Sequence, residues 1–553
     1  MEKKYTITFR GEQYRYDEDT LFKDIAADFQ KYYTYPILGL NVDNDIVELS
    51  SKLNKNCKVN FYDRSSFEGY DIYSKSALFI LVLAVKNVLG KDIEVSIEHS
   101  MDYGVFCKVI GKKINAVTVN RLYQEMQKIV KQDYLYVKSS VARLDAIKFF
   151  KKKKVLDKVD VLKYISNTYI NLYRINDEYD YFYGKMAYNT GQIDKFKLTY
   201  IKDNGFVMLL PSVDNPNKIM PYKHHEKVFD KFREYLNWSK SLNITNIADL
   251  NKVVSNAKEG ELISLSEAYY DGQLSKIADE ILHGKKDVKI VLIAGPSSSG
   301  KTTTSNKLDI YLKSKGFKTH PIALDDYFIP LAIRPKDENG NPDFESIRAV
   351  DTKQFNKDLS NLLKGKKVEL PHYNFELGER EYNGDYLQLG KKDIIIVEGL
   401  HALNKTLTES IPSNKKYKVF ISPFTGIGID SHSYVHTSDI RRLRRIVRDS
   451  KTRGLGAKET LAMWPTIRDG ERENIFRFQD NVDTVINSSL LYEIGVLKTY
   501  VEPLLFNVTE EDPEYMEALR LINFLRNFLP IASDDVPQDS VLREFIGGSC
   551  FKD

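Results

Sequence analysis

The feature that most constrains this chain is a phosphate-binding loop between an apolar run and an amphipathic segment. Residues 295–302 read Gly-Pro-Ser-Ser-Ser-Gly-Lys-Thr, which matches the pattern G-x-x-x-x-G-K-[ST]. Residues 288–294 before it are mostly apolar, as is typical of a buried parallel strand. After it, Leu308 and Leu312 give a helix one apolar face, and Gly316 can end that helix. Strand, loop and helix in this order favour a nucleotide site over a turn that binds no ligand.

Each residue type in the loop has a physical task. Glycines adopt backbone conformations that are closed to other residues, so that backbone N–H groups can point at phosphate oxygens. We expect Lys301 to reach the β- and γ-phosphates of ATP and Thr302 to offer a hydroxyl to Mg²⁺. The N-terminus of the following helix adds a partial positive charge. The predicted phosphate contacts are Gly295, Ser297, Ser298, Ser299, Gly300, Lys301, Thr302 and Thr303.

Composition and charge exclude several classes of protein. The chain has 553 residues, 42% of them apolar, which is enough for several folded domains. Its 81 basic and 77 acidic residues leave a formal net charge of +4, which argues against a mainly nucleic-acid-binding surface. The three cysteines show no C-x-x-C spacing, and no apolar stretch follows the first charged residues. The longest apolar run, residues 77–85, is too short to cross a bilayer, so we predict a core helix and a cytoplasmic protein without membrane contact.

From residue 287 onward, short apolar runs alternate with helical segments. Such alternation predicts an α/β fold with a doubly wound parallel sheet. We assign residues 287–553 to one phosphate-loop domain with a C-terminal helical extension. Its further predicted strands are residues 321–324, 393–397, 417–421 and 483–486.

Two acidic residues directly follow strands of this sheet, where ligands of such folds bind. Asp325 follows the second strand, and a carboxylate there can orient or deprotonate a substrate hydroxyl, unless it only caps a helix. Glu398 follows the third strand, where it can hold Mg²⁺ together with Thr302 or form a structural salt bridge. We predict a catalytic role for Asp325 and a metal-binding role for Glu398.

A basic helix is predicted over residues 439–449. Arg441, Arg444, Arg445 and Arg448 recur at spacings of three and four, so one helix face can clamp phosphate oxygens and offset the charge that develops during transfer. Because two glycines follow nearby, at positions 454 and 456, we interpret the segment as a closing lid rather than a nucleic-acid contact.

Several of these motifs together resemble one enzyme family. Residues 295–302, 324–328, 369–375, 395–399 and 439–449 are similar, in order and spacing, to the uridine kinase/phosphoribulokinase family. The resemblance implies transfer of the ATP γ-phosphoryl group to a small alcohol, with Asp325 as catalytic base and Lys301 and Arg444 beside the transferred group. It implies substrate contacts from Asp325, Tyr327, Phe328, Phe344, Tyr373, Phe375, Arg380 and Arg441, and nucleotide contacts from Arg445 and Arg448.

One departure from that family concerns the base pocket. Uridine kinases of the family often carry a histidine where Gly378 stands here, with Arg380 just beyond it. A missing imidazole removes a hydrogen-bonding partner for a pyrimidine. The family resemblance implies uridine or cytidine as the acceptor, whereas this departure leaves the preferred nucleoside open, and the choice between ATP and GTP is open as well.

The first half of the chain resembles a different protein. Residues 1–62 contain short strands and one helix, and are similar to the β-grasp TGS domain of threonyl-tRNA synthetases. Residues 63–210 resemble the α+β editing domain that follows it in those enzymes. Where the editing family has metal-ligating His and Cys, this chain has residues 73–77 without histidine, and Phe182 and Met186, so we interpret the site as lost. Residues 211–286 are expected to form a helical connector.

The sequence thus favours a nucleoside kinase fused to a synthetase-like front half. A kinase acting on another small hydroxyl substrate, such as a sugar phosphate, is the first alternative. A nucleotide-switched, RNA-binding regulatory protein that grips a tRNA-like ligand with its front half is the second. A homo-oligomer is compatible with either, and the sequence does not fix the oligomeric state.

Overall fold

We describe a computed structural model of the chain, in which the described residues are 3–101, 103–202, 204–284, 286–336, 346–374 and 377–551. The predicted substrate residues Phe344 and Phe375 lie outside the described residues. The chain forms two compact units. The first contains residues 1–223, 243–251 and 426–436, and the second contains residues 224–242, 252–425 and 437–553.

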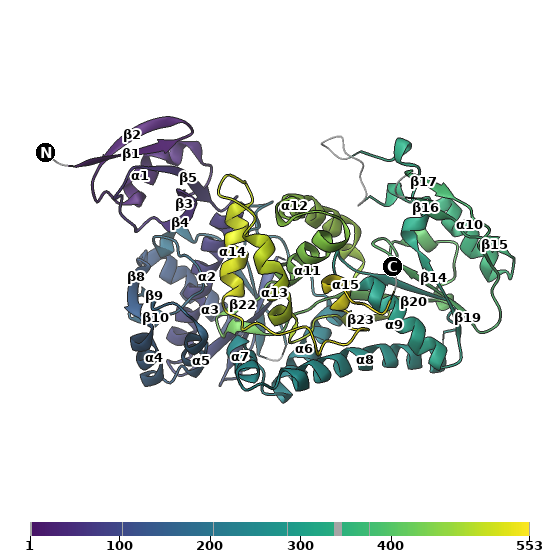
Figure 1. The fold of residues 1–553 in the computed structure, drawn as a ribbon. Helices are drawn as coiled ribbons and strands as arrows, with labels where there is room; N and C mark the ends of the chain where they lie inside the picture. The colour runs from purple at the N-terminus through teal and green to yellow at the C-terminus, as the bar shows by residue number, and fades with distance from the viewer. Residues whose placement is uncertain are drawn as a thin grey trace. The chain divides into compact units, whose positions relative to one another are not determined.

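The first unit begins with a small mixed sheet of strand order β2-β1-β5-β3-β4 (Figure 1). Apolar residues alternate along β1, so that Ile7 and Phe9 point inward, and helix α1 packs Phe22, Ile25 and Phe29 against them. This is the predicted β-grasp arrangement. Its elements are β1 (Lys4–Phe9), β2 (Glu12–Asp17), α1 (Phe22–Phe29), β3 (Ile37–Val42), β4 (Asp45–Glu48) and β5 (Cys57–Asp63).

The rest of the first unit is an α+β fold around helix α2 (Phe67–Leu89). By length and composition α2 could cross a membrane, but 72% of its most apolar window is buried within the fold, so it is the core helix predicted from residues 77–85. Two antiparallel sheets, β11-β12-β7-β6 and β10-β9-β8, complete the fold. The elements are β6 (Glu94–Met101), β7 (Gly104–Ile110), α3 (Ala116–Gln132), β8 (Val137–Ala142), α4 (Arg143–Lys152), α5 (Leu156–Tyr164), β9 (Tyr169–Ile175), β10 (Glu178–Asp180), β11 (Lys197–Tyr200) and β12 (Gly205–Leu209).

A hairpin from the second half of the chain belongs to this first unit. Its strands are β21 (Gly428–Asp430) and β22 (Ser433–Tyr434). Buried Lys158 lies 2.9 Å from Asp430 and 3.1 Å from Asp180, and His432 Nδ1 lies 2.5 Å from Asp180 Oδ2. Burial alone would lower the pKa of Lys158, but the surrounding carboxylates raise it, so Lys158 keeps its positive charge. The domain boundaries expected from the sequence did not include this exchange, because it depends on contacts between residues about 250 positions apart.

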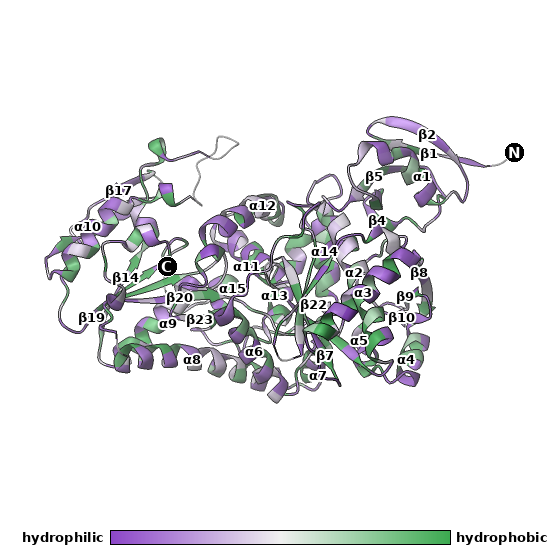
Figure 2. Ribbon diagram, turned by 180° about the vertical axis from the view of Figure 1, so that it is seen from behind, coloured by the Kyte–Doolittle hydropathy of each residue, from purple (hydrophilic) through white to green (hydrophobic). Residues whose placement is uncertain are grey.

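The second unit is built on a parallel sheet of strand order β14-β19-β13-β20-β23. All five strands run in the same direction, and the inner ones read as apolar runs, as expected for strands buried on both faces; they are largely hydrophobic in Figure 2. The α/β fold class with a doubly wound sheet is therefore confirmed. The strands are β13 (Ile290–Ala294), β14 (Lys318–Ala323), β19 (Asp393–Glu398), β20 (Lys416–Ser422) and β23 (Thr484–Asn487).

Helices and short strands surround this sheet. Helix α9 follows the phosphate loop and ends just before Gly316, whose φ of +86° suits a helix end. The predicted connector does not form a unit of its own, because most of its helical residues pack with the sheet in the second unit. The remaining elements are α6 (Glu226–Ser241), α7 (Ile247–Ser255), α8 (Glu259–His283), α9 (Lys301–Ser314), α10 (Thr352–Leu363), β15 (Val368–Glu369), β16 (His372–Asn374), β17 (Glu379–Glu381), β18 (Tyr386–Leu387), α11 (Thr437–Thr452), α12 (Ala457–Asn474), α13 (Glu493–Leu505), α14 (Tyr515–Leu525) and α15 (Arg543–Ile546).

Candidate active site

The phosphate loop joins the central strand β13 to helix α9. Gly300 has a φ of +86°, and a Cβ at Gly295 would collide with the carbonyl oxygen of Ile421 on the next strand, so both positions require glycine. The Lys301 ammonium donates to the carbonyl oxygens of Gly295, at 3.1 Å, and Pro296, at 3.2 Å. The lysine side chain thus lies against the backbone of its own loop.

The ends of two neighbouring strands bring the predicted acidic residues to this loop. Glu398 ends β19 and pairs in register with Ile293 of β13 and Ala323 of β14. Its Oε1 lies 3.3 Å from Thr302 Oγ1. Burial raises the pKa of Glu398 to about 7; Lys301 lowers this pKa, whereas the nearby Asp325 raises it. The sheet thus brings together the two residues predicted to bind metal, because they follow adjacent parallel strands.

Asp325 lies just past β14, in a short 3₁₀ turn. The protein around it raises the pKa of its carboxyl by desolvation, while Lys301 lowers it. The residue is exposed to solvent, so water limits this effect. An accessible carboxylate within the electrostatic reach of Lys301 can orient or accept the proton of a substrate hydroxyl.

Oxygen donors at this position suit a hard divalent cation. The Thr302 hydroxyl and the Glu398 carboxylate are 3.3 Å apart, and Mg²⁺ is usually held by one or two such groups together with water and phosphate oxygens. The residues therefore fit Mg²⁺ bound jointly with a nucleotide. Among the described residues, no group of three or more His, Cys, Asp or Glu forms a separate metal cage.

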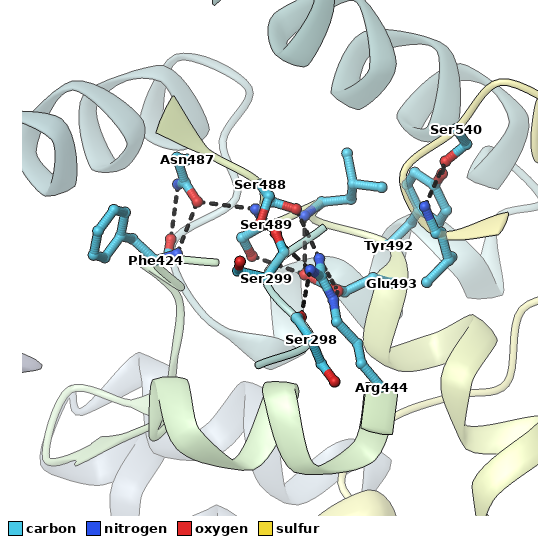
Figure 3. A network of polar contacts seen from close by, with 12 residues as sticks. Ser298, Ser299, Phe424, Arg444, Asn487, Ser488, Ser489, Tyr492, Glu493 and Ser540 are labelled. Atoms are coloured by element: carbon cyan, nitrogen blue, oxygen red, sulfur yellow. Dashed lines mark hydrogen bonds and ion pairs between the residues drawn. The ribbon is translucent and has the colours of Figure 1, made fainter. Parts of the chain in front are cut away.

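Helix α11 carries the predicted arginine face, and the structure buries most of it. Arg444 is fully buried; its Nε donates to Glu493 Oε2 at 2.7 Å, and its Nη2 donates to the carbonyl oxygen of Ser488 at 2.7 Å (Figure 3). The same guanidinium also donates to the carbonyl oxygen of Ser298 in the phosphate loop, at 3.4 Å. Arg444 therefore ties the loop to the end of β23.

The neighbouring arginines extend this network. Arg441 forms a bidentate pair with Glu471 of α12, with N–O distances of 2.8 and 2.7 Å, and Glu471 Oε1 accepts from the Ser297 amide at 2.8 Å. Arg445 donates to Ser297 Oγ at 2.6 Å, whereas Arg448 donates to Asp449 at 2.8 Å. Burial lowers the pKa of Arg441 to about 10, so it stays charged at neutral pH.

The packing of this helix contradicts its interpretation as a closing lid. Ile440, Leu443 and Ile446 are fully buried on the face of α11 opposite to solvent, and buried carboxylates pair with the arginines beside them. The sequence pattern could not show this, because the partners Glu471 and Glu493 lie 30 and 49 residues further along the chain. Direct contacts of Arg441, Arg444, Arg445 and Arg448 with a nucleotide or substrate stay predictions.

The predicted aromatic pocket is packed in this structure. Tyr327 is 1% exposed and donates to Asp358 at 3.2 Å, and the rings of Phe328 and Tyr373 meet edge to face at 5.7 Å. Arg380 pairs with Asp351 at 2.9 Å. A stacked base would therefore need these side chains to rearrange, and their substrate contacts stay predictions.

Three residues near the site were not predicted from the sequence. Arg334 is 4% exposed, its guanidinium lies 4.6 Å from the centre of the Phe328 ring, and its Nη2 donates to the Tyr373 hydroxyl at 2.8 Å. Glu471 and Glu544 both accept hydrogen bonds from the phosphate loop or the first turn of α9. Neither glutamate follows a strand or belongs to a recognisable motif, so no local signal could have found them.

Comparison with known proteins places this site in a family. Residues 290–489 match the family described as Phosphoribulokinase / Uridine kinase. A uridine kinase of Staphylococcus haemolyticus is 33% identical over 170 residues, which make up 30% of this chain and 70% of that protein. The chain belongs to the phosphoribulokinase/uridine kinase family. A uridine kinase of Halobacterium salinarum is 30% identical over 163 residues, which make up 29% of this chain and 63% of that protein.

The first half matches other proteins. A threonine–tRNA ligase of Clostridium kluyveri is 27% identical over 246 residues, or 44% of this chain and 37% of the ligase. The fused organisation expected from the sequence is thereby confirmed. The chain spans less than two thirds of the length of the Halobacterium and Clostridium relatives.

Proposed function

We propose that this protein is a nucleoside kinase that transfers the γ-phosphoryl group of ATP to the 5′-hydroxyl of a ribonucleoside, uridine or cytidine. The observation that carries the proposal is the convergence of Lys301, Glu398 and Asp325 at the carboxyl ends of β13, β19 and β14. The relatives named uridine kinase motivate the choice of acceptor. We place the reaction in the cytoplasm.

Each residue has a stated task in this proposal. The loop amides and Lys301 bind the triphosphate, and Thr302 and Glu398 would hold Mg²⁺, which would offset the negative charge of the phosphates. Asp325 orients the acceptor hydroxyl and takes its proton as the oxygen attacks phosphorus. The arginines of α11 hold the shape of the loop, since Arg444 and Arg445 contact Ser298 and Ser297.

The test is a panel of nucleosides assayed with purified full-length protein, ATP and Mg²⁺. We expect 5′-monophosphate formation from uridine or cytidine, detected by mass, and ADP in equal amount. ADP release without a phosphorylated nucleoside, or phosphorylation at another hydroxyl, would contradict the proposal. Replacing ATP by GTP in the same assay identifies the donor.

One observation favours an acceptor that carries an anionic group as a second candidate. The Arg334 guanidinium is buried between Phe328 and Tyr373, and its charge lowers the pKa of Asp325. A cation near the carboxylate of Asp325 suits an acceptor that carries a phosphate, such as a sugar phosphate. Under this candidate, Arg334→Met would raise KM for a sugar phosphate more than it raises KM for uridine. Competition between uridine and ribulose 5-phosphate separates the two acceptors directly.

A further inference from the structure

A glutamate of helix α15 contacts the first turn of α9, the helix that follows the phosphate loop. Glu544 Oε2 accepts from the Thr303 backbone amide at 3.1 Å and from the Thr303 hydroxyl at 2.8 Å. Thr303 is the third residue of α9, so its amide is one of the donors that the helix itself leaves unpaired. In a phosphate loop, these first-turn amides are the groups that bind phosphate oxygens.

The segment that carries Glu544 is firmly anchored. Asp539 pairs with Lys307 at 2.9 Å, and Ser540 donates to Glu267 at 2.6 Å. Val541 and Phe545 are fully buried; Val541 packs against Gly300 of the loop, and the Phe545 ring lies 5.0 Å from the Arg444 guanidinium. Helix α15 lies beside α11 in Figure 1. These contacts build residues 539–546 into the wall of the nucleotide site.

Glu471 and Glu544 both accept hydrogen bonds from backbone amides, Glu471 from Ser297 of the loop and Glu544 from Thr303 of α9, and they differ in how they are held. Glu471 is fully buried and held by its bidentate pair with Arg441. If its side chain rotated away, the buried Arg441 guanidinium would lose its partner. Glu544 is only partly buried, while its neighbour Phe545 is buried, so its side chain can rotate away while the backbone stays anchored. Its negative charge also raises the pKa of Glu398.

We propose that Glu544 is a built-in competitor of the nucleotide: its carboxylate occupies the Thr303 amide and hydroxyl until a nucleotide phosphate displaces it. The inference rests on the proposed function, since it presumes that the loop binds a nucleotide. A carboxylate and a phosphate cannot share one amide donor, and their like charges repel at this distance. Part of the binding free energy is therefore used to move Glu544, and the apparent affinity for any phosphorylated nucleoside is lower than the loop alone would give.

The test compares the wild-type full chain with Glu544→Gln by calorimetric titration with Mg·ATP, ADP and adenosine. The substitution keeps the size of the side chain but removes its charge, so we expect ATP and ADP to bind about tenfold more tightly. Adenosine has no phosphate, and its affinity should not change. The matched control is Glu511→Gln, which removes one charge from an exposed loop residue and should alter neither value. In turnover assays, KM for ATP should fall.

A second variant keeps the inference testable if Glu544→Gln folds poorly. Glu544→Asp retains the charge but shortens the side chain by one methylene, so it should lose the Thr303 contacts and bind ATP more tightly than wild type. Unchanged or weaker ATP binding in both folded variants, with wild-type binding intact, would overturn the inference alone. If neither the wild type nor the variants bind any nucleotide, the proposed function fails and the inference fails with it.

Discussion

The two halves of this chain both resemble enzymes, yet the residues at the two expected sites differ in polarity and in exposure to solvent. In the first half, the resemblance places Tyr73, Ala77, Phe182 and Met186 at the positions of the editing family's His and Cys, and all four are at most 3% exposed in one apolar core. In the second half, Asp325 stays exposed, and Lys301 and Glu398 are only partly buried. Apolar side chains can pack together in a core, whereas charged groups need water, a partner or a ligand. The contrast predicts chemistry in the second half only.

The largest effect should come from Asp325→Asn. An amide cannot accept the proton of the acceptor hydroxyl, so we expect nucleoside turnover to fall about 100- to 10,000-fold, with ATP binding retained. Asp534→Asn, at an exposed position, is the control for loss of one negative charge. Turnover of Asp325→Asn within a few-fold of wild type would remove the base from the mechanism and weaken the contrast between the halves.

The next effect concerns stability of the second unit. Arg444→Met leaves the Glu493 carboxylate buried without its guanidinium, and we expect a loss of about 3–5 kcal/mol in the free energy of unfolding. Both tryptophans, Trp238 and Trp464, belong to this unit, so tryptophan fluorescence in urea follows its unfolding separately. The double variant Arg444→Met/Glu493→Leu should recover part of the loss, and an unchanged transition in the single variant would contradict the role of this ion pair.

A smaller effect should appear in the pH dependence of Mg²⁺ binding. Burial raises the pKa of Glu398 to about 7 in the metal-free protein, and Mg²⁺ prefers the ionised carboxylate. Apparent Mg²⁺ affinity in the presence of ATP should therefore fall as the pH drops below about 7, by up to about tenfold per pH unit, and level off above it. Glu398→Gln should bind more weakly at every pH and lose this slope; a slope that persists in the variant would assign the titration to another group.

The smallest effect is expected from Met186→Leu in the first half. This change conserves volume in an apolar core and should cost less than about 1.5 kcal/mol, measured by circular dichroism during thermal unfolding. Kinase turnover should equal that of wild type, because we assign no chemistry to this position. A drop of more than a few-fold would show that the core of the first half matters to the reaction, and would break the comparison.

Local sequence patterns predicted much of the fold but less of the site. The five strands of the parallel sheet could be found because each contains a short apolar run, and Asp325 and Glu398 because they directly follow two of these runs. Local patterns of this kind could not predict that Tyr327 and the arginines of α11 are buried. An arginine-rich helix looks the same in sequence whether its partners are phosphates or the distant carboxylates Glu471 and Glu493.

The sequence by itself determined the order of strand, phosphate loop and helix, the acidic residues at the strand ends, and the family to which they belong. These features are local, since a loop that cradles phosphate needs fixed residues at fixed spacing. Tertiary structure alone decided that residues 426–436 join the first unit, that buried ion pairs hold the arginines, and that Glu544 reaches Thr303 across 241 positions of sequence. Such contacts depend on how distant elements pack, and no spacing along the chain records them.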